Sequence, residues 1–199
     1  MRLMIVGQKW LGAEVLRLCL QRGDDVAAVS APRMDDRMAA EAAAHGVPAC
    51  QVSGRLDGSW VPDGLDLIVC AHAHAFVTEG ARSKARYGAL GYHPSLLPRH
   101  RGRDAIRWAI HMGDRVTGGS VFWLDDGADT GDVAAQDWCW VRPGDTPELL
   151  WRRDLAPMGL RLMAQVLTCL DYGIVPRTRQ EPDLATWEPA FKQLPLKMS

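Results

Sequence analysis

The stretch Asp66-Leu67-Ile68-Val69-Cys70-Ala71 gives the clearest indication of the fold. Five apolar residues in a row after an aspartate predict a strand that is buried on both faces, as in a parallel sheet. Nearer the start of the chain, Leu3 to Val6 and Asp25 to Ser30 predict two more strands. Helical patterns follow these strands, over Leu11 to Arg22 and over Met34 to His45. Strands and helices that alternate at this spacing predict an α/β fold with a mostly parallel central sheet flanked by helices.

The second half of the chain has a different pattern. It predicts four further elements, namely strands at Gly88–Tyr92, Thr117–Leu124 and Asp132–Val141 and a helix at Arg103–His111. A long helical pattern covers Thr146 to Tyr172, and Pro157 is expected to kink or split it, because proline lacks a backbone donor. After Gly173 the chain is rich in proline, which predicts an extended tail. We therefore expect one domain over residues 1–191 and a frayed tail over 192–199.

Composition excludes several classes of protein. The 199 residues include 23 basic and 24 acidic side chains, so no basic excess is available to bind a nucleic-acid backbone. No apolar run approaches the ~18 residues that a membrane-spanning helix needs. The five cysteines are odd in number and form no Cys-x-x-Cys pair, which favours a reducing compartment over a disulfide framework. These features predict a cytoplasmic protein without membrane or nucleic-acid partners.

Two short patterns allow both a structural and a functional interpretation. The loop from Gly7 to Gly12 is either a tight turn between a strand and a helix or part of the mouth of an active site. It is not a dinucleotide fingerprint, because Lys9 occupies the position of the second glycine. His72 and His74 follow the strongest strand and would point to the same side of an extended chain. With His93 and a carboxylate they suit a metal site, but no further ligand pattern accompanies them, so we expect no metal.

Two loops are candidates for catalysis. The first runs from Gly91 to Gly102 and holds His93 between a strand end and a proline, at the sheet edge where open α/β sheets bind ligands. The second runs from Leu124 to Asp132 and contains four aspartates. Such a loop is either a solvated turn or the source of a carboxylate that faces His93, and an aspartate beside an imidazole suits acid–base chemistry at a carbonyl.

The combination of these loops resembles the folate-dependent formyltransferase family. The residues that carry the resemblance are His93-Pro94-Ser95-Leu96-Leu97-Pro98 with Arg101-Gly102, and Asp129-Thr130-Gly131, with Asp129 following His93 by 36 residues. The family includes glycinamide ribonucleotide and methionyl-tRNA formyltransferases. The sequence is most similar to the amino-terminal hydrolase domain of 10-formyltetrahydrofolate dehydrogenase, from Met1 to about Glu188.

The resemblance implies a Rossmann-like formyltransferase domain that uses 10-formyltetrahydrofolate as co-substrate and needs no metal. It implies that His93 and Asp129 form the catalytic pair. It also implies a folate site, built from Ala73, His74, Ala75, Phe76, Asp125, Asp126, Gly127 and Ala128. The acceptor side would be formed by Gln8, Lys9 and Trp10.

Two departures from the family pattern matter. Gly91 occupies the position where the transferases usually have an asparagine that stabilises the tetrahedral oxyanion. Loss of one such donor typically costs ~100- to 1000-fold in rate. The hydrolase domain also lacks this asparagine. The chain length leaves no room for the C-terminal barrel domain of many relatives, so a tRNA acceptor is not expected.

Three functions remain as hypotheses: formyl transfer to a small amine, hydrolysis of 10-formyltetrahydrofolate by water, and folate binding with little catalysis. A metal-dependent hydrolase that uses His72, His74 and His93 is the least favoured hypothesis. Arg99, Arg101 and Arg103 either belong to a solvated loop or hold an anionic acceptor or the glutamate tail of folate. Trp108 and Trp123 have apolar neighbours and are predicted to lie in the core.

Overall fold

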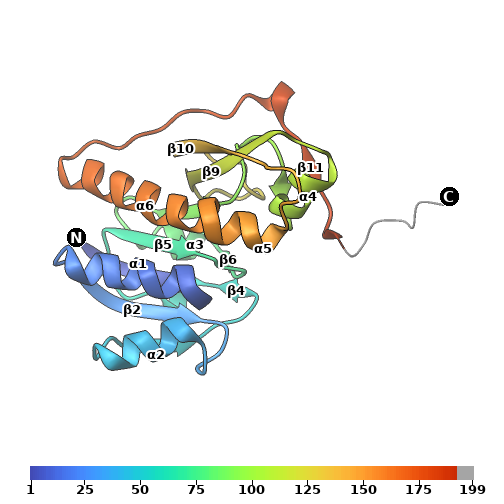
Figure 1. The fold of residues 1–199 in the computed structure, drawn as a ribbon. Coiled ribbons are helices and arrows are strands. Elements are labelled where there is room, and N and C mark those ends of the chain that lie inside the picture. The colour runs from blue at the N-terminus through green and yellow to red at the C-terminus, as the bar shows by residue number, and fades with distance from the viewer. Residues whose placement is uncertain (192–199) are drawn as a thin grey trace.

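A seven-stranded sheet forms the centre of the structure, a computed structural model that describes residues 1–191 (Figure 1). The predicted frayed tail, 192–199, lies outside the described residues. Across the sheet the strands are β10 (Val133–Trp140), β9 (Val116–Trp123), β7 (Ala89–His93), β5 (Leu67–Ala71), β1 (Arg2–Gly7), β2 (Asp25–Ala31) and β3 (Ala49–Gln51).

Parallel pairing dominates the sheet, as the alternation of strands and helices predicts. β5 pairs in parallel with both β1 and β7, whereas β9 runs antiparallel to β7 and to β10. Because β5 and β7 are parallel neighbours, their carboxyl ends, Ala71 and His93, lie at the same edge of the sheet. Ligands of open α/β sheets bind at this edge.

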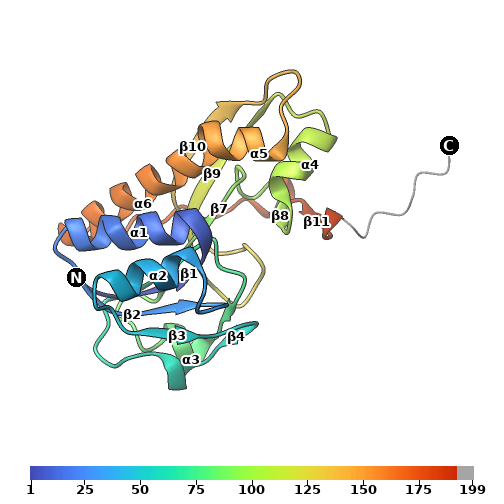
Figure 2. The ribbon, with the colours of Figure 1, turned by 60° about the horizontal axis from the view of Figure 1, so that its bottom comes forward.

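Helices cover one face of the sheet, and shorter elements cover the other. Figure 2 shows α1 (Lys9–Gln21), α2 (Arg37–Ala44) and α6 (Ala156–Asp171) on the same side. Successive side chains of β1 alternate between the faces: Leu3 and Ile5 pack in the larger apolar cluster with α1 and α6, and Met4 and Val6 in a second cluster near α3 (Glu79–Arg82). This two-sided burial explains the continuous apolar runs in the sequence.

The long helical pattern is interrupted just before Pro157. It forms α5 (Pro147–Leu150), a π-helical turn (Trp151–Leu155) and α6. The N–H of Ala156 donates to the carbonyl of Trp151, five residues earlier, and Pro157 has no N–H to continue the α-helical pattern. The prediction that Pro157 disturbs this helix is therefore confirmed.

Helix boundaries differ from the prediction at α1, α2 and α4, and at α2 a side-chain cap explains the difference. The predicted helix Met34–His45 starts only at Arg37, because the carboxylate of Asp36 accepts a hydrogen bond from the N–H of Met38 (2.8 Å). The helix near residue 105 is α4 (Ala105–His111). Trp108 and Trp123 are buried, as predicted.

The sequence did not predict the shortest elements. These are β3, β4 (Arg55–Leu56), β6 (Phe76–Val77), β8 (Arg101–Gly102), β11 (Trp187–Glu188) and 3₁₀ turns at Gly58–Trp60 and Pro182–Leu184. Elements of two or three residues show no periodicity, and partners distant in sequence determine them: β4 pairs with β6, and β11 pairs with β8. No helix within residues 1–191 is long and apolar enough to cross a membrane.

Candidate active site

His93 closes β7, and its two ring nitrogens have different environments. The side chain is 9% exposed. Nε2 lies 2.7 Å from the carbonyl oxygen of His100, so Nε2 must donate the hydrogen of that bond. Nδ1 lies 3.6 Å from Oδ2 of Asp129. The second nitrogen is therefore the one that faces the carboxylate predicted to be its partner.

Backbone groups hold Asp129 in place. Its Oδ2 accepts a hydrogen bond from the N–H of Gly102 (2.8 Å), and its φ of +57° lies in the left-handed region. Left-handed backbone is unfavourable for a residue other than glycine, so the surrounding contacts must hold it. Earlier in the same loop, Oδ1 of Asp125 accepts from the N–H of Gly127 and from the hydroxyl of Thr130. A Cβ at residue 127 would lie 1.9 Å from Oγ1 of Thr130, so this turn requires glycine.

A cleft of about 1270 Å³ opens beside this pair. Eleven of the thirteen residues predicted for the site line it: His93, Asp129, Ala73, His74, Ala75, Phe76, Asp125, Gly127, Ala128, Lys9 and Trp10. The structure does not bring Gln8 and Asp126 to this surface. Gln8 is buried at the start of α1, and the carboxylate of Asp126 lies 2.6 Å from the guanidinium of Arg82.

His72 and His74 line the cleft as neutral rings. The expectation that both lie in an extended chain was wrong, because His72 has a φ of +56°. Their ring centres are 5.6 Å apart, edge to face. Burial, reinforced by the charge of Lys9, lowers the pKa of His72 to about 4. Burial and the charge of Arg103 also lower the pKa of His74. Among residues 1–191, no three His, Cys, Asp or Glu side chains form a group that could hold a metal ion.

Gly91 lies in β7 at the wall of the cleft, and two apolar side chains occupy the space next to it. A Cβ at residue 91 would lie 3.1 Å from Cε1 of Phe122 and 3.2 Å from Cδ2 of Leu124. The position of the usual asparagine is therefore crowded in this chain. An oxyanion formed in the cleft would therefore need a donor other than a side-chain amide at residue 91, such as His93, water or a backbone N–H.

The three arginines of the His93 loop have separate environments. Arg99 forms two hydrogen bonds to the carboxylate of Asp114, and Arg101 donates twice to Oε1 of Gln180. Of the three, Arg103 alone lines the cleft. Of the three arginines, only Arg103 is therefore placed where it could hold an anionic acceptor or the glutamate tail of folate.

Several residues near the site were not identified from the sequence. Pro147, Trp151 and Arg152 line the cleft from the helical stretch that contains the π turn, and Gln180 donates to the carbonyl of Asp129. Pro157 was a usable signal for the first group, because it marks the helix interruption. Gln180 carries no such signal, since a single glutamine in a polar tail has no recognisable pattern.

Comparisons with known proteins show the family to which the chain belongs. Residues 47–167 match the sequence profile of the family described as formyl transferase. The chain belongs to the formyl transferase family. The resemblance predicted from the loops at His93 and Asp129 is thereby confirmed, as is the α/β fold.

The similar proteins span several members of this family. Cytosolic 10-formyltetrahydrofolate dehydrogenase of Homo sapiens is 37% identical over 212 residues, an alignment that includes all of this chain and 24% of the relative. This chain therefore spans about a quarter of the length of the curated relatives first matched.

Two solved structures share the fold. Glycinamide ribonucleotide transformylase 1 from Symbiobacterium toebii has a TM-score of 0.73 at 25% identity and covers 87% of this chain and 88% of its own. An N-formyltransferase from Helicobacter canadensis, solved with folinic acid and dTDP-3-aminofucose, has a TM-score of 0.81 at 16% identity and covers 97% and 72%. The second likeness supports the fold alone.

Proposed function

We propose that this chain transfers the formyl group of 10-formyltetrahydrofolate to a small amine and releases tetrahydrofolate. The observation that carries the proposal is the pair of His93 and Asp129 at the wall of one cleft, with His93 Nδ1 3.6 Å from Asp129 Oδ2. Membership of the formyl transferase family supports the same reaction.

In this proposal the two side chains divide the chemistry between them. The amine attacks the formyl carbon on N10 of the folate, and a proton on His93 Nδ1 stabilises the oxygen that becomes negative. Asp129 keeps that proton on Nδ1 and takes the proton that the amine loses, directly or through water. The C–N10 bond then breaks, N10 takes up the proton that Asp129 received from the amine, directly or through water, and tetrahydrofolate leaves. Binding both reactants in one cleft contributes further by proximity.

The donor and the acceptor are assigned to different parts of the cleft. We assign the pteridine to the backbone of residues 73–76 and the loop 125–128, and the amine to the side of Lys9 and Trp10. Lys9, Arg103 and Arg152 line the cleft outside the folate segments, and their positive charge favours the neutral, nucleophilic form of an acceptor amine on that side. A cytoplasmic location, a single domain over 1–191 and the absence of a nucleic-acid partner belong to the same proposal.

Hydrolysis of 10-formyltetrahydrofolate is the second candidate. Gly91 supports it, because the hydrolase domain that the sequence resembles also lacks the asparagine, and the 37% identity to 10-formyltetrahydrofolate dehydrogenase favours it too. In this reaction water takes the place of the amine at the same two side chains.

The two reactions are separated by following tetrahydrofolate release by absorbance, first without an amine and then with a panel of amines. Release that needs an amine supports the transferase, and the formylated product is identified by mass spectrometry. Release without amine selects the hydrolase. Donor binding without release in both conditions contradicts both. A strong chelator is added in a parallel arm, and loss of turnover there would move the assignment to the metal-dependent hydrolase.

A further inference from the structure

One short loop, Pro98–Gly102, holds both catalytic side chains through its backbone. The carbonyl of His100 accepts the hydrogen bond from Nε2 of His93 (2.7 Å), and the N–H of Gly102 donates to Oδ2 of Asp129 (2.8 Å). A shift of this loop would therefore change the orientation of the ring and of the carboxylate together.

The C-terminal segment 174–191, called the strap here, fixes that loop. Figure 1 shows the strap running above β10 and then turning down into its own short strand, β11, which pairs in parallel with β8. Thr186 makes three of the contacts: its N–H donates to Pro98, its carbonyl accepts from the N–H of Arg101, and its hydroxyl oxygen accepts from the N–H of His100 (2.8 Å). These bonds attach His100, whose carbonyl orients His93, and the loop residues on either side of it to the strap.

Gln180 is the second attachment, and it joins the two catalytic loops to each other. Its side-chain amide donates to the carbonyls of Asp129 (2.9 Å) and Gly131 (2.6 Å). Its oxygen accepts from Nε and Nη2 of Arg101. The residue is 6% exposed. Only an uncharged amide supplies two donors to carbonyls and an acceptor to a guanidinium from one planar group.

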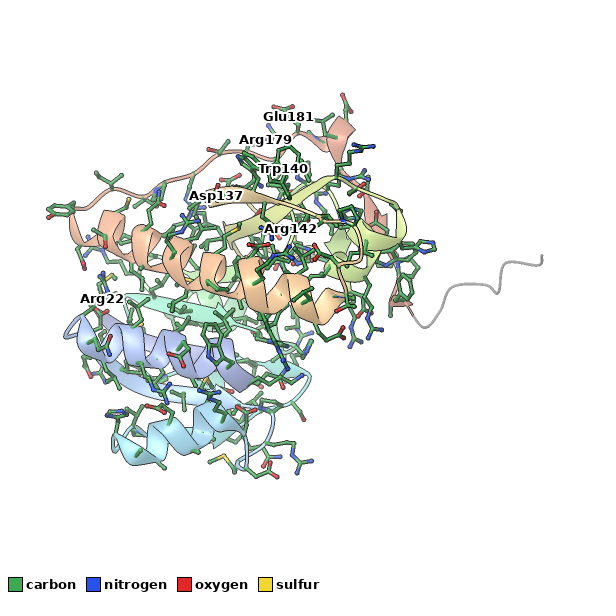
Figure 3. The ribbon with its side chains drawn as sticks, in the orientation of Figure 1. Arg22, Asp137, Trp140, Arg142, Arg179 and Glu181 are labelled. Carbon is green, nitrogen blue, oxygen red and sulfur yellow. The ribbon has the colours of Figure 1, made fainter. Side chains whose placement is uncertain are left out.

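The neighbours of Gln180 have no such role. Arg179 and Glu181 are exposed and lie along the strap in Figure 3. In an extended segment alternate side chains point to opposite sides, so Gln180 alone of these three points inward. Its contacts also explain how Asp129 keeps its left-handed φ of +57°.

We propose that Gln180, together with Thr186, is a positioning residue for formyl transfer, which sets the relation between His93 and Asp129 from the strap. The proposal rests on the proposed function for its catalytic consequence. Neither residue lines the cleft. Misplacement of catalytic groups by about 1 Å costs on the order of 100-fold in rate, so loss of these contacts should lower kcat and leave the binding of folate in place.

Two variants and one control test this on the full chain. Gln180→Leu removes both functions of the amide, Thr186→Val removes one hydroxyl at constant shape, and Glu181→Gln is the control on the same strap. Three quantities are measured: kcat, the Kd for tetrahydrofolate, and amide hydrogen exchange of Gly102 by NMR. Because the Gly102 N–H is bonded to Asp129, its exchange reports the position of that carboxylate directly.

In Gln180→Leu we expect a ~10- to 100-fold fall in kcat, at least ~10-fold faster Gly102 exchange and a Kd within about threefold of the wild type. In Thr186→Val we expect smaller changes of the same sign, and none in the control. An unchanged kcat or unchanged Gly102 exchange in Gln180→Leu overturns the proposal. If that variant does not fold, Thr186→Val decides by the same criteria. A wild type that releases no tetrahydrofolate would contradict the proposed function, and Gly102 exchange would still decide whether the strap positions Asp129.

Discussion

The hydrogen bond at His93 determines which of its ring nitrogens is available for the proposed reaction. A carbonyl oxygen only accepts, so the bond from Nε2 to His100 fixes a hydrogen on Nε2. The other ring nitrogen, Nδ1, faces Oδ2 of Asp129 at 3.6 Å. In the proposed reaction Nδ1 is therefore the nitrogen that acts on the formyl group, with the carboxylate beside it.

We predict that Asp129→Asn lowers turnover at least ~100-fold, because the amide cannot take a proton from the acceptor. The asparagine oxygen can still accept from the N–H of Gly102, so the fold and folate binding are retained. Turnover, the Kd for tetrahydrofolate and the thermal midpoint are measured. Asp63→Asn is the matched control, since Asp63 lies outside the cleft, is exposed and pairs with Lys84. Turnover of Asp129→Asn close to that of the wild type would contradict the role of this residue.

At Gly91 we predict that introduction of the usual asparagine does not improve the enzyme. In Gly91→Asn the new Cβ meets Phe122 at 3.1 Å and Leu124 at 3.2 Å. Overpacking of this kind typically costs about 1–3 kcal/mol of the free energy of unfolding. Urea unfolding and turnover are compared for Gly91→Asn and Gly91→Ala. A variant that is as stable as the wild type and faster would show that the position has room for the side chain.

At the scale of elements, burial explains what the sequence could predict. β5 is apolar along its whole length, and β1 is apolar from Leu3 onward, because both faces of the sheet are covered, so their composition alone identifies them. β8 and β11 have two residues each and exist through their mutual pairing, 86 positions apart from Arg101 to Trp187. Such pairing is a property of the folded chain, and no local pattern encodes it.

The same distinction applies to the site. His93 and Asp129 stand in loops of unusual composition, with prolines, glycines and aspartates, and these loops could be recognised from the sequence. Gln180 comes from the proline-rich C-terminal segment, and Trp151 comes from the long helical pattern. Neither segment has a local sequence pattern that marks these residues as part of a site. Asp126 shows the reverse case, because it belongs to the recognised loop but turns outward to Arg82.

The pair of Asp145 and Arg153 connects the loop before α5 to the π turn, and it predicts a pH dependence of stability. Hydrogen bonds from Arg153 lower the pKa of Asp145 to about 2, from a usual value of 3.8. The folded chain thus binds this proton less readily than the unfolded chain does, so the stabilisation is complete above the unfolded pKa and is lost as the pH falls toward 2. Asp145→Asn should lower the free energy of unfolding by roughly 1–2 kcal/mol at pH 7.

Urea unfolding of the wild type and Asp145→Asn at several pH values checks this prediction. The difference between them should be constant from pH 7 to about pH 5 and should shrink as the pH falls toward 2. If the difference in the free energy of unfolding between the wild type and Asp145→Asn stays constant down to pH 3, protonation of Asp145 does not control the contribution of this ion pair to stability.

At the scale of the whole molecule, the cleft joins segments from most of the chain, from Lys9 near the start to Arg152 in the π turn. A ligand that contacts all of them binds the folded state and has no comparable site in the unfolded chain. Binding must therefore stabilise the entire fold by mass action.

We predict that tetrahydrofolate at 100 times its Kd raises the free energy of unfolding by about 2.7 kcal/mol. For a chain of this size the thermal midpoint then rises by roughly 5–10 °C. Calorimetry with and without tetrahydrofolate measures this shift. His93→Ala should show nearly the same shift, because the ring acts on the formyl group. No shift at saturating tetrahydrofolate would argue against a folate site in the cleft.

The most direct test of the account is the rate of tetrahydrofolate release from 10-formyltetrahydrofolate by the wild type and by His93→Ala, at saturating donor and with the acceptor that supports turnover. The account predicts at least a ~100-fold lower rate in His93→Ala, with the thermal midpoint and the Kd for tetrahydrofolate retained. A rate in His93→Ala within a few-fold of the wild type would contradict the assignment of this cleft as the site of formyl transfer.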